Sequence, residues 1–283
     1  MALPQLSLQE APRQHRQLGV RIRLERSIFD LADEDIRLLL DALAHHGVLC
    51  IVNQPPIEPR QLHDFAARWG EVIELPAGLA FANKEPGLPS IARIGNIRPD
   101  GSIISSVRFA EYWHHDGDFW PPGQNFIVNF LSGVQIPSTG GRTGFLDSRL
   151  AYEQLEDEHK ADLADAYVCV RASEISDFQK AAPHELPPDV QHPVLLPHPL
   201  TKQIALYLPD SSSGIQKKNG QSCGAVQTLV ESVQQKLGVR EHVWEVGDLL
   251  IIDNLQVMHR SMGGYGDRPR LLHRCQARIS YAR

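Results

Sequence analysis

Short strand-like segments dominate the sequence, and this feature most constrains the fold. Apolar or alternating runs recur through the second half of the chain, including NFIVNFLSGVQIP (125–137), GDLLIIDN (247–254) and RLLHRCQARISYA (270–282). Strands and helices do not alternate regularly, as they would in a parallel doubly wound sheet. We therefore predict a mainly β protein with flanking helices, built as a closed or sandwiched antiparallel sheet.

Helical spacing is confined to a few segments. From Asp33 onward, apolar residues recur at helical intervals until Gly47, a residue that favours the end of a helix. The apolar run VLCIV follows as a buried strand, and a second helix is expected from about Pro59 through Trp69. Two further helices are expected in 149–167 and 225–238.

No internal repeat or linker divides the chain, so residues 1–283 are expected to form one domain. Residues 1–26 read as an irregular N-terminal arm that ends in a short strand. Residues 71–111 are rich in Gly, Pro and Asn and include one strand-like run. Long loops of this kind often carry a substrate site or a lid, which is the role we expect here.

Composition excludes several classes of function. A formal net charge of −6 argues against nucleic acid as a general partner, since duplex binding usually needs a basic face. The longest apolar runs are far shorter than the roughly 20 residues of a membrane helix. The N-terminus lacks the pattern of a secretory signal, and the four cysteines show no C-x-x-C spacing. We expect a cytoplasmic protein with reduced thiols.

The segment YWHHDGDFW (112–120) places two histidines and two aspartates among aromatic residues. If it is extended, His114 and Asp116 point to one side and His115 to the other. Asp118 would share the His114 face, although a turn cap is its expected role. An H-x-D triplet alone is weak evidence for a metal site.

A third candidate ligand comes 143 residues after Asp116. The strand in GDLLIIDNLQVMHRS leads through a turn at Asp253 and Asn254 to His259. Two histidines and one carboxylate would leave three positions of an octahedral ion open, as Fe(II) requires to bind a chelating cosubstrate and O₂ together. A structural zinc site would instead need a fourth ligand.

Two arginines in DRPRLLHR complete the set of candidates. Arg270 and Arg274 are four residues apart and share a face if the segment is extended. Two permanently charged planar donors inside a barrel would require anions to neutralise them. Two surface arginines are the alternative interpretation.

Together, WHHD, GGRT, GDLLIIDNLQVMHR and RPRLLHR resemble the taurine dioxygenase and 2,4-dichlorophenoxyacetate dioxygenase family of iron- and 2-oxoglutarate-dependent oxygenases. The order and spacing match from about residue 30 to the C-terminus. The resemblance implies a distorted double-stranded β-helix, a cupin-like jelly roll with helices packed outside. It also implies Fe(II), 2-oxoglutarate and O₂ as the cofactor set, with release of succinate and CO₂.

Site residues follow from the same resemblance. His114, Asp116 and His259 would bind the iron, whereas His115 occupies a variable position that faces away. Thr143 and Arg270 match the positions that hold the far carboxylate of 2-oxoglutarate. Arg274 matches a position that often meets an anionic group of the substrate.

The expected partner is a small organic substrate, a carboxylate or a sulfonate, that is hydroxylated or desaturated. Taurine itself is not expected, because no clear match to the sulfonate-contacting histidine is found around the 73–111 loop. Family relatives often form dimers or tetramers, yet no pattern here points to an interface. Two alternatives stay open: a zinc-dependent hydrolase with the same triad, and a small-molecule-binding protein without turnover.

Overall fold

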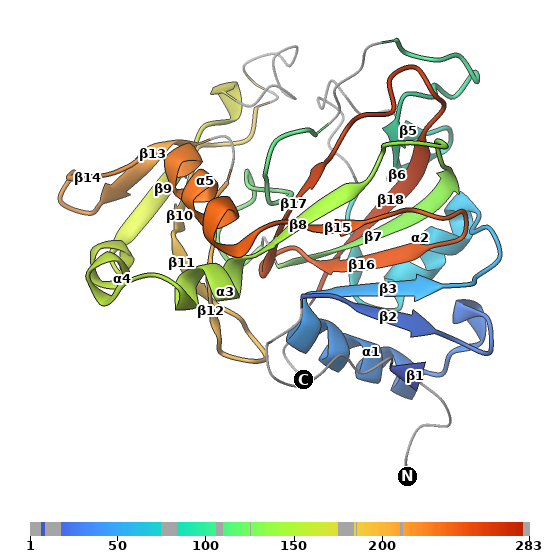
Figure 1. The fold of residues 1–283 in the computed structure, drawn as a ribbon, viewed down its shortest axis with the longest axis horizontal. Coiled ribbons are helices and arrows are strands. Elements are labelled where there is room, and N and C mark those ends of the chain that lie inside the picture. Colours follow the sequence, from blue (N-terminus) through green and yellow to red (C-terminus); the bar gives the residue numbers. More distant parts are fainter. Residues whose placement is uncertain are drawn as a thin grey trace.

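Strands account for most of the regular structure (Figure 1). The computed structural model describes residues 7–8, 18–74, 84–105, 110–124, 126–174, 184, 186–209 and 212–279. Five α-helices occur there: α1 (Asp33–His46), α2 (Pro59–Ala67), α3 (Ser148–Glu153), α4 (Asp157–Leu163) and α5 (Val226–Leu237). Short 3-10 turns lie at Ile28–Asp30 and Ala172–Glu174.

One large sheet forms the framework of the molecule. Its strands follow the order β1-β2-β3-β16-β7-β18-β6-β5, with β4 also paired to β18. All pairs in it are antiparallel except β2 with β3. Its members are β1 (Ser7–Leu8), β2 (Val20–Arg23), β3 (Val48–Val52), β4 (Glu71–Val72), β5 (Lys84–Glu85), β6 (Leu88–Gly95), β7 (Ile127–Gln135), β16 (Leu249–Asp253) and β18 (Leu271–Arg278).

A smaller sheet packs against the inner face of the large one. It has the order β15-β8-β17, from β15 (Arg240–His242), β8 (Thr143–Asp147) and β17 (Val257–Ser261). A buried apolar cluster joins the two sheets, because Phe145 and Val257 pack with Leu131, Leu250 and Leu272. This arrangement confirms the predicted mainly β, jelly-roll class.

Two helices cover the outer face of the large sheet. Residues of α1 and α2, such as Leu43 and Phe65, share a second buried cluster with outward-facing Leu49 and Ile51 of β3. As predicted, α1 ends at Gly47, which adopts φ 72°; a Cβ there would lie 2.8 Å from Val257 Cγ2. The apolar run VLCIV is buried on both sides for this reason.

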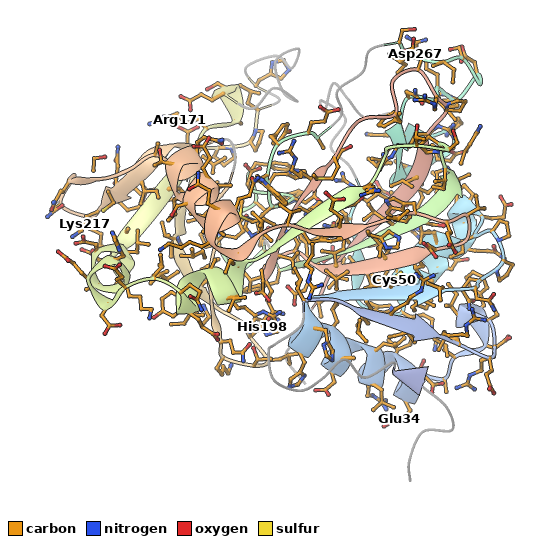
Figure 2. All side chains as sticks on the ribbon, in the orientation of Figure 1. Glu34, Cys50, Arg171, His198, Lys217 and Asp267 are labelled. Atoms are coloured by element: carbon orange, nitrogen blue, oxygen red, sulfur yellow. The ribbon has the colours of Figure 1, made fainter. Side chains whose placement is uncertain are left out.

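A lateral lobe holds the remaining strands. It contains a four-stranded sheet in the order β10-β9-β13-β14, the pair β11–β12, and α3, α4 and α5 (Figure 1). Lys217 and Arg171, labelled in Figure 2, lie here. The strands are β9 (Ala166–Val170), β10 (Val190–Pro193), β11 (Leu195–Pro197), β12 (Ile204–Leu206), β13 (Ser212–Lys217) and β14 (Ser222–Gly224).

Two local expectations differ from the structure. The single helix expected in 149–167 is divided into α3 and α4, and Leu163 is buried while Leu155 is only half-buried. The 71–111 region contributes β4, β5 and β6 to the large sheet, so it is more than connecting loops. The substrate or lid role expected for 71–111 stays a prediction, and residues 75–83 and 106–109 of this region lie outside the described residues.

Candidate metal and cosubstrate site

His114 lies in the loop before β7 and contacts β17 directly. His114 and His259 form an isolated antiparallel bridge, with N–O distances of 3.2 and 3.1 Å. The 112–120 segment is not extended throughout, because the chain turns at Gly117, which adopts φ 67°, and Trp120 N–H donates to Gly117 O. One bridge is nevertheless enough to place the His114 backbone against the second histidine.

The three predicted iron ligands meet in space. One ligand atom from each of His114, Asp116 and His259 lies within 4.8 Å of the other two. His259 Nε2 is 3.2 Å from Asp116 Oδ2, and the two imidazole centroids are 4.4 Å apart. His115 points away, as expected, with Nδ1 3.4 Å from Leu208 O.

The tautomer of His114 suits a metal ligand. Its Nδ1 is 2.9 Å from the carbonyl oxygen of Tyr112, which can only accept, so Nδ1 carries the proton and Nε2 presents a lone pair. Burial, followed by the charge of His259, lowers the pKa of His114 to about 4. The imidazole is therefore neutral at physiological pH and free to bind a cation.

Asp116 is held by several partners. Arg274 Nη1 donates to its Oδ1 at 2.5 Å, and Asn129 Nδ2 donates to its Oδ2 at 2.8 Å. Asn254 pairs with its backbone, accepting from Asp116 N at 2.7 Å and donating to Asp116 O at 2.8 Å. Burial opposes ionisation, but Arg274 and the two histidines outweigh it and hold the pKa of Asp116 well below its usual range.

Arg270 is a buried cation that lacks a carboxylate partner among the described residues. It is 2% exposed, its Nε donates to Gly141 O at 3.1 Å, and its Nη1 has no hydrogen-bond partner in the described part of the chain. Its guanidinium lies 5.5 Å from the ring centroid of Tyr265, and burial lowers its pKa. Such a group is costly to bury alone, so the site suits an anion.

Thr143 lies on the same side of the small sheet as His259. Phe145 pairs with His259 and Thr143 with Ser261, and paired or alternate residues share a face. Thr143 Oγ1 accepts a hydrogen bond from Trp244 Nε1 at 2.9 Å.

The glycines of GGRT allow the close backbone approach that brings Arg270 to this strand. A Cβ at Gly141 would lie 3.1 Å from Arg270 Nε, and one at Gly140 would lie 2.4 Å from the Gly264 backbone. Both glycines also adopt positive φ. Arg270 thus lies against the GGRT segment that leads into Thr143, and their binding of 2-oxoglutarate stays a prediction.

Arg274 has a partner that the sequence did not suggest. We expected it to face a substrate anion, and its closest described anion is Asp116 itself. The side chain is almost fully buried, and its Nε has no hydrogen-bond partner among the described residues. It therefore sits beside a metal-ligand candidate with donor capacity left over.

Four supporting residues escaped sequence reasoning: Asn129, Gln276 and Trp244, and Asn254 beyond its role in a turn. Gln276 Nε2 donates to Asn129 Oδ1 at 2.8 Å, which orients the amide that holds Asp116. A polar residue inside the apolar run of β7 was the available signal for Asn129.

Comparison with known proteins agrees with this geometry. The model of the family described as "Taurine catabolism dioxygenase TauD, TfdA family" matches residues 13–276. The chain belongs to this family, and it is a 2-oxoglutarate-dependent non-haem iron dioxygenase that uses Fe(II), 2-oxoglutarate and O₂. The match favours the dioxygenase prediction over the zinc-hydrolase and non-catalytic alternatives.

Individual relatives span most of the chain. It is 27% identical to the alpha-ketoglutarate-dependent 2,4-dichlorophenoxyacetate dioxygenase of Burkholderia sp. (strain RASC), over 81% of each sequence. It is also 27% identical to an alkylsulfatase of Acinetobacter baylyi, covering 92% of this chain and 83% of the relative.

Solved structures show the same fold. AAD-2, crystallised with Mn(II) and N-oxalylglycine, superposes with a TM-score of 0.82 at 22% identity, over 97% of this chain and 98% of that one. A taurine dioxygenase from Burkholderia xenovorans gives 0.71 at 20% identity, over 93% and 88%. Among the described residues, no helix has the length and apolar character needed to cross a membrane.

Proposed function

We propose that this protein oxidises a C–H bond of a small anionic organic substrate, with His114, Asp116 and His259 holding the Fe(II). The observation that carries this proposal is the convergence of three metal-ligating side chains in a chain that also buries Arg270, whose Nη1 has no hydrogen-bond partner among the described residues. Bound iron, together with 2-oxoglutarate and O₂, supplies the oxidising chemistry and releases succinate and CO₂.

The residues of this chain prepare that chemistry in defined ways. The Tyr112 carbonyl fixes the proton of His114 on Nδ1, which leaves Nε2 for the ion. Asn129 and Asn254 hold the carboxylate and the backbone of Asp116, so the ligand set is ordered before the ion arrives. His114 and His259 are buried and Asp116 is half-buried, which limits the access of bulk water to the reacting centre.

Arg270 and Thr143 are proposed to bind the far carboxylate of 2-oxoglutarate. The planar guanidinium can pair with a carboxylate through two parallel hydrogen bonds, which would satisfy the buried Nη1. The Thr143 hydroxyl accepts from Trp244, so its own proton is available to donate.

Arg274 is proposed to meet the anionic group of the substrate while neutralising Asp116. Its unpartnered Nε supports the first role, and its contact with Oδ1 supports the second. The names of several relatives describe anionic substrates: dichlorophenoxyacetate, phenoxypropionate and sulfate esters. These names favour a carboxylate or an organosulfur anion.

We also propose a cytoplasmic location, because all four cysteines are free. Thiols persist in reducing compartments and usually pair in oxidising ones.

Anaerobic titration of the purified protein with Fe(II) and then 2-oxoglutarate tests the proposed cofactor site. We expect a weak visible metal-to-ligand charge-transfer band that is lost in His114→Ala. A band of full intensity in that variant would contradict the ligand assignment.

Arg274→Gln separates the two roles proposed for this residue. As a substrate anchor, Arg274 should matter to the substrate KM in a succinate-release screen while the charge-transfer band persists. If the variant instead weakens Fe(II) binding and leaves the substrate KM unchanged, the side chain acts only on Asp116.

A further inference from the structure

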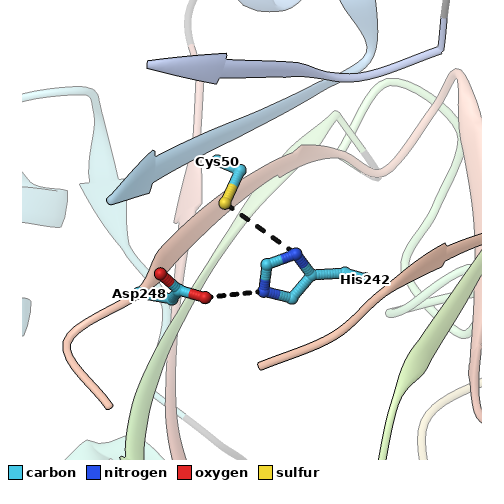
Figure 3. A group of neighbouring side chains, drawn as sticks. All are labelled: Cys50, His242 and Asp248. Carbon is cyan, nitrogen blue, oxygen red and sulfur yellow. Dashed lines mark hydrogen bonds and ion pairs between the residues drawn. The ribbon is translucent and has the colours of Figure 1, made fainter. Parts of the chain in front are cut away.

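A second group of metal-ligating side chains lies apart from the dioxygenase site and shares no residue with it. Cys50 of β3, His242 at the end of β15 and Asp248 just before β16 form this group (Figure 3). Cys50 Sγ is 3.8 Å from His242 Nδ1, and His242 Nε2 is 3.0 Å from Asp248 Oδ2. Neighbouring segments of the two sheets therefore bring together a thiol, an imidazole and a carboxylate.

The hydrogen bonds of this group leave a lone pair directed at the sulfur. Asp248 Oδ2 accepts from the backbone N–H of Glu245 as well as from His242, and an ionised carboxylate can only accept. The proton of His242 consequently lies on Nε2, so Nδ1 presents its lone pair towards Cys50. A carboxylate on the far nitrogen is the usual partner of a metal-binding histidine.

The spacing of the two donor atoms suits a tetrahedral ion. Zinc bonds of about 2.3 Å to sulfur and about 2.0–2.1 Å to nitrogen, opened to a tetrahedral angle, hold the two atoms about 3.6 Å apart. The observed 3.8 Å requires only a small adjustment. In the absence of an ion, the same contact is a hydrogen bond between the thiol and the imidazole.

The electrostatic surroundings of Cys50 also favour a cation over a bare thiolate. Burial, and next the charge of Asp248, raise the pKa of the Cys50 thiol to about 12. The same carboxylate would attract a metal ion, which displaces the thiol proton to solvent as the metal–sulfur bond forms. Nearby Arg21 opposes this attraction, but it pairs with Glu245 at 3.7 Å.

A pocket gives an ion a route to the two donors. It has a volume of about 230 Å³ and is lined by residues of β2, β3, β8, β15 and β16, including Cys50 and His242. Two protein donors leave two positions of a four-coordinate ion open, and the pocket has space for water molecules to fill them.

We propose that Cys50 and His242 bind a thiophilic transition-metal ion of the zinc class, with Asp248 fixing the imidazole and water from the pocket completing the coordination. Sulfur distinguishes this site from the dioxygenase site, whose three candidate ligands offer only nitrogen and oxygen. Cobalt(II) is therefore a selective probe, because only a cysteine ligand gives an intense thiolate-to-cobalt charge-transfer band in the near ultraviolet.

The experiment is a Co(II) titration of the full-length, metal-free protein under reducing conditions. The wild-type protein should develop the thiolate band, Cys50→Ser should lose it, and Cys223→Ser, a matched change at a more exposed thiol, should keep it. Asp116→Ala should also keep it, which separates this site from the dioxygenase site.

Two results would overturn the proposal. The first is the absence of the thiolate band in the wild-type protein at saturating Co(II). This result needs no variant, so it overturns the proposal even if Cys50→Ser fails to fold. A band that survives in folded Cys50→Ser, checked by circular dichroism, would assign the sulfur ligand elsewhere. Neither result depends on 2-oxoglutarate turnover, so this test and that of the proposed function fail independently.

Discussion

The triad of His114, Asp116 and His259 and the pair of Cys50 and His242 both lie between the large and small sheets, yet they are built differently. In the triad, groups outside the set hold His114 and Asp116, and three ligand atoms converge. In the pair, the imidazole lies between the thiol and Asp248, so the carboxylate is used up in orienting the ring (Figure 3). The hydrogen-bond partners, more than the residue types, decide how many donor atoms remain for an ion.

Removing a triad ligand should have the largest effect. Asp116→Ala deletes the carboxylate ligand and leaves Arg274 buried without its ion pair, so we expect 2-oxoglutarate-dependent succinate release to fall to background. Asp157→Ala, at an exposed position of α4, is the control and should retain wild-type turnover. Turnover in Asp116→Ala comparable with that of the control would remove Asp116 from the ligand set.

Arg270→Lys should have the next largest effect. Lysine keeps the charge but cannot form two parallel hydrogen bonds, so the KM for 2-oxoglutarate should rise between about 10- and 100-fold. Arg268→Lys changes an exposed neighbour in the same way and should leave that KM unchanged. Equal KM values for the two variants would mean that Arg270 does not bind the cosubstrate.

Asn254→Ala sharpens the comparison, because it alters what holds a ligand and not the ligand itself. Loss of both hydrogen bonds to the Asp116 backbone should weaken Fe(II) binding by about 10- to 100-fold. The measurement is the Fe(II) dependence of the anaerobic charge-transfer band. Asn219→Ala, which removes an exposed turn side chain, is the control. If both variants bind Fe(II) with the same affinity, other contacts order the backbone of Asp116.

The smallest effect concerns acid stability. Burial lowers the pKa of His192, which donates Nε2–H to the carbonyl of Asp118 in the turn after Asp116. Below about pH 6.5 the His192 imidazole binds a proton in the unfolded chain but stays neutral in the folded chain. The free energy of unfolding therefore falls as the pH drops. His192→Gln should reduce the slope of unfolding free energy against pH by up to about 1.4 kcal/mol per unit. Urea titrations of metal-free protein between pH 6.5 and 5 measure this slope; an unchanged slope would contradict the buried neutral state.

The identities of the candidate ligands were predictable from sequence because their motifs are local. H-x-D and the strand–turn–His segment each place ligands within a few residues, and α1 was predictable from apolar spacing and Gly47. The 112–120 segment is not extended throughout, because Gly117 turns the chain, and its pairing is limited to one bridge between His114 and His259. The conclusion from alternation was still right for His114 and His115.

Long-range hydrogen bonds account for what could not be predicted. Asn254 reaches a backbone 138 residues away, and Gln276 supports Asn129 across β18 and β7. The approach of Cys50 to His242 could not be predicted, because it depends on how β3, β16 and β15 are arranged in space. Sheet register of this kind has no local sequence signal.

Trp244 joins the two regions. Its ring makes an edge-to-face contact with His242, with centroids 4.8 Å apart, and its Nε1–H donates to Thr143 Oγ1. If an ion on Cys50 and His242 changes the affinity for 2-oxoglutarate by any factor through this indole, the cosubstrate must change the affinity for that ion by the same factor. In that case one side chain would link the binding of the metal ion and of the cosubstrate in a single thermodynamic cycle.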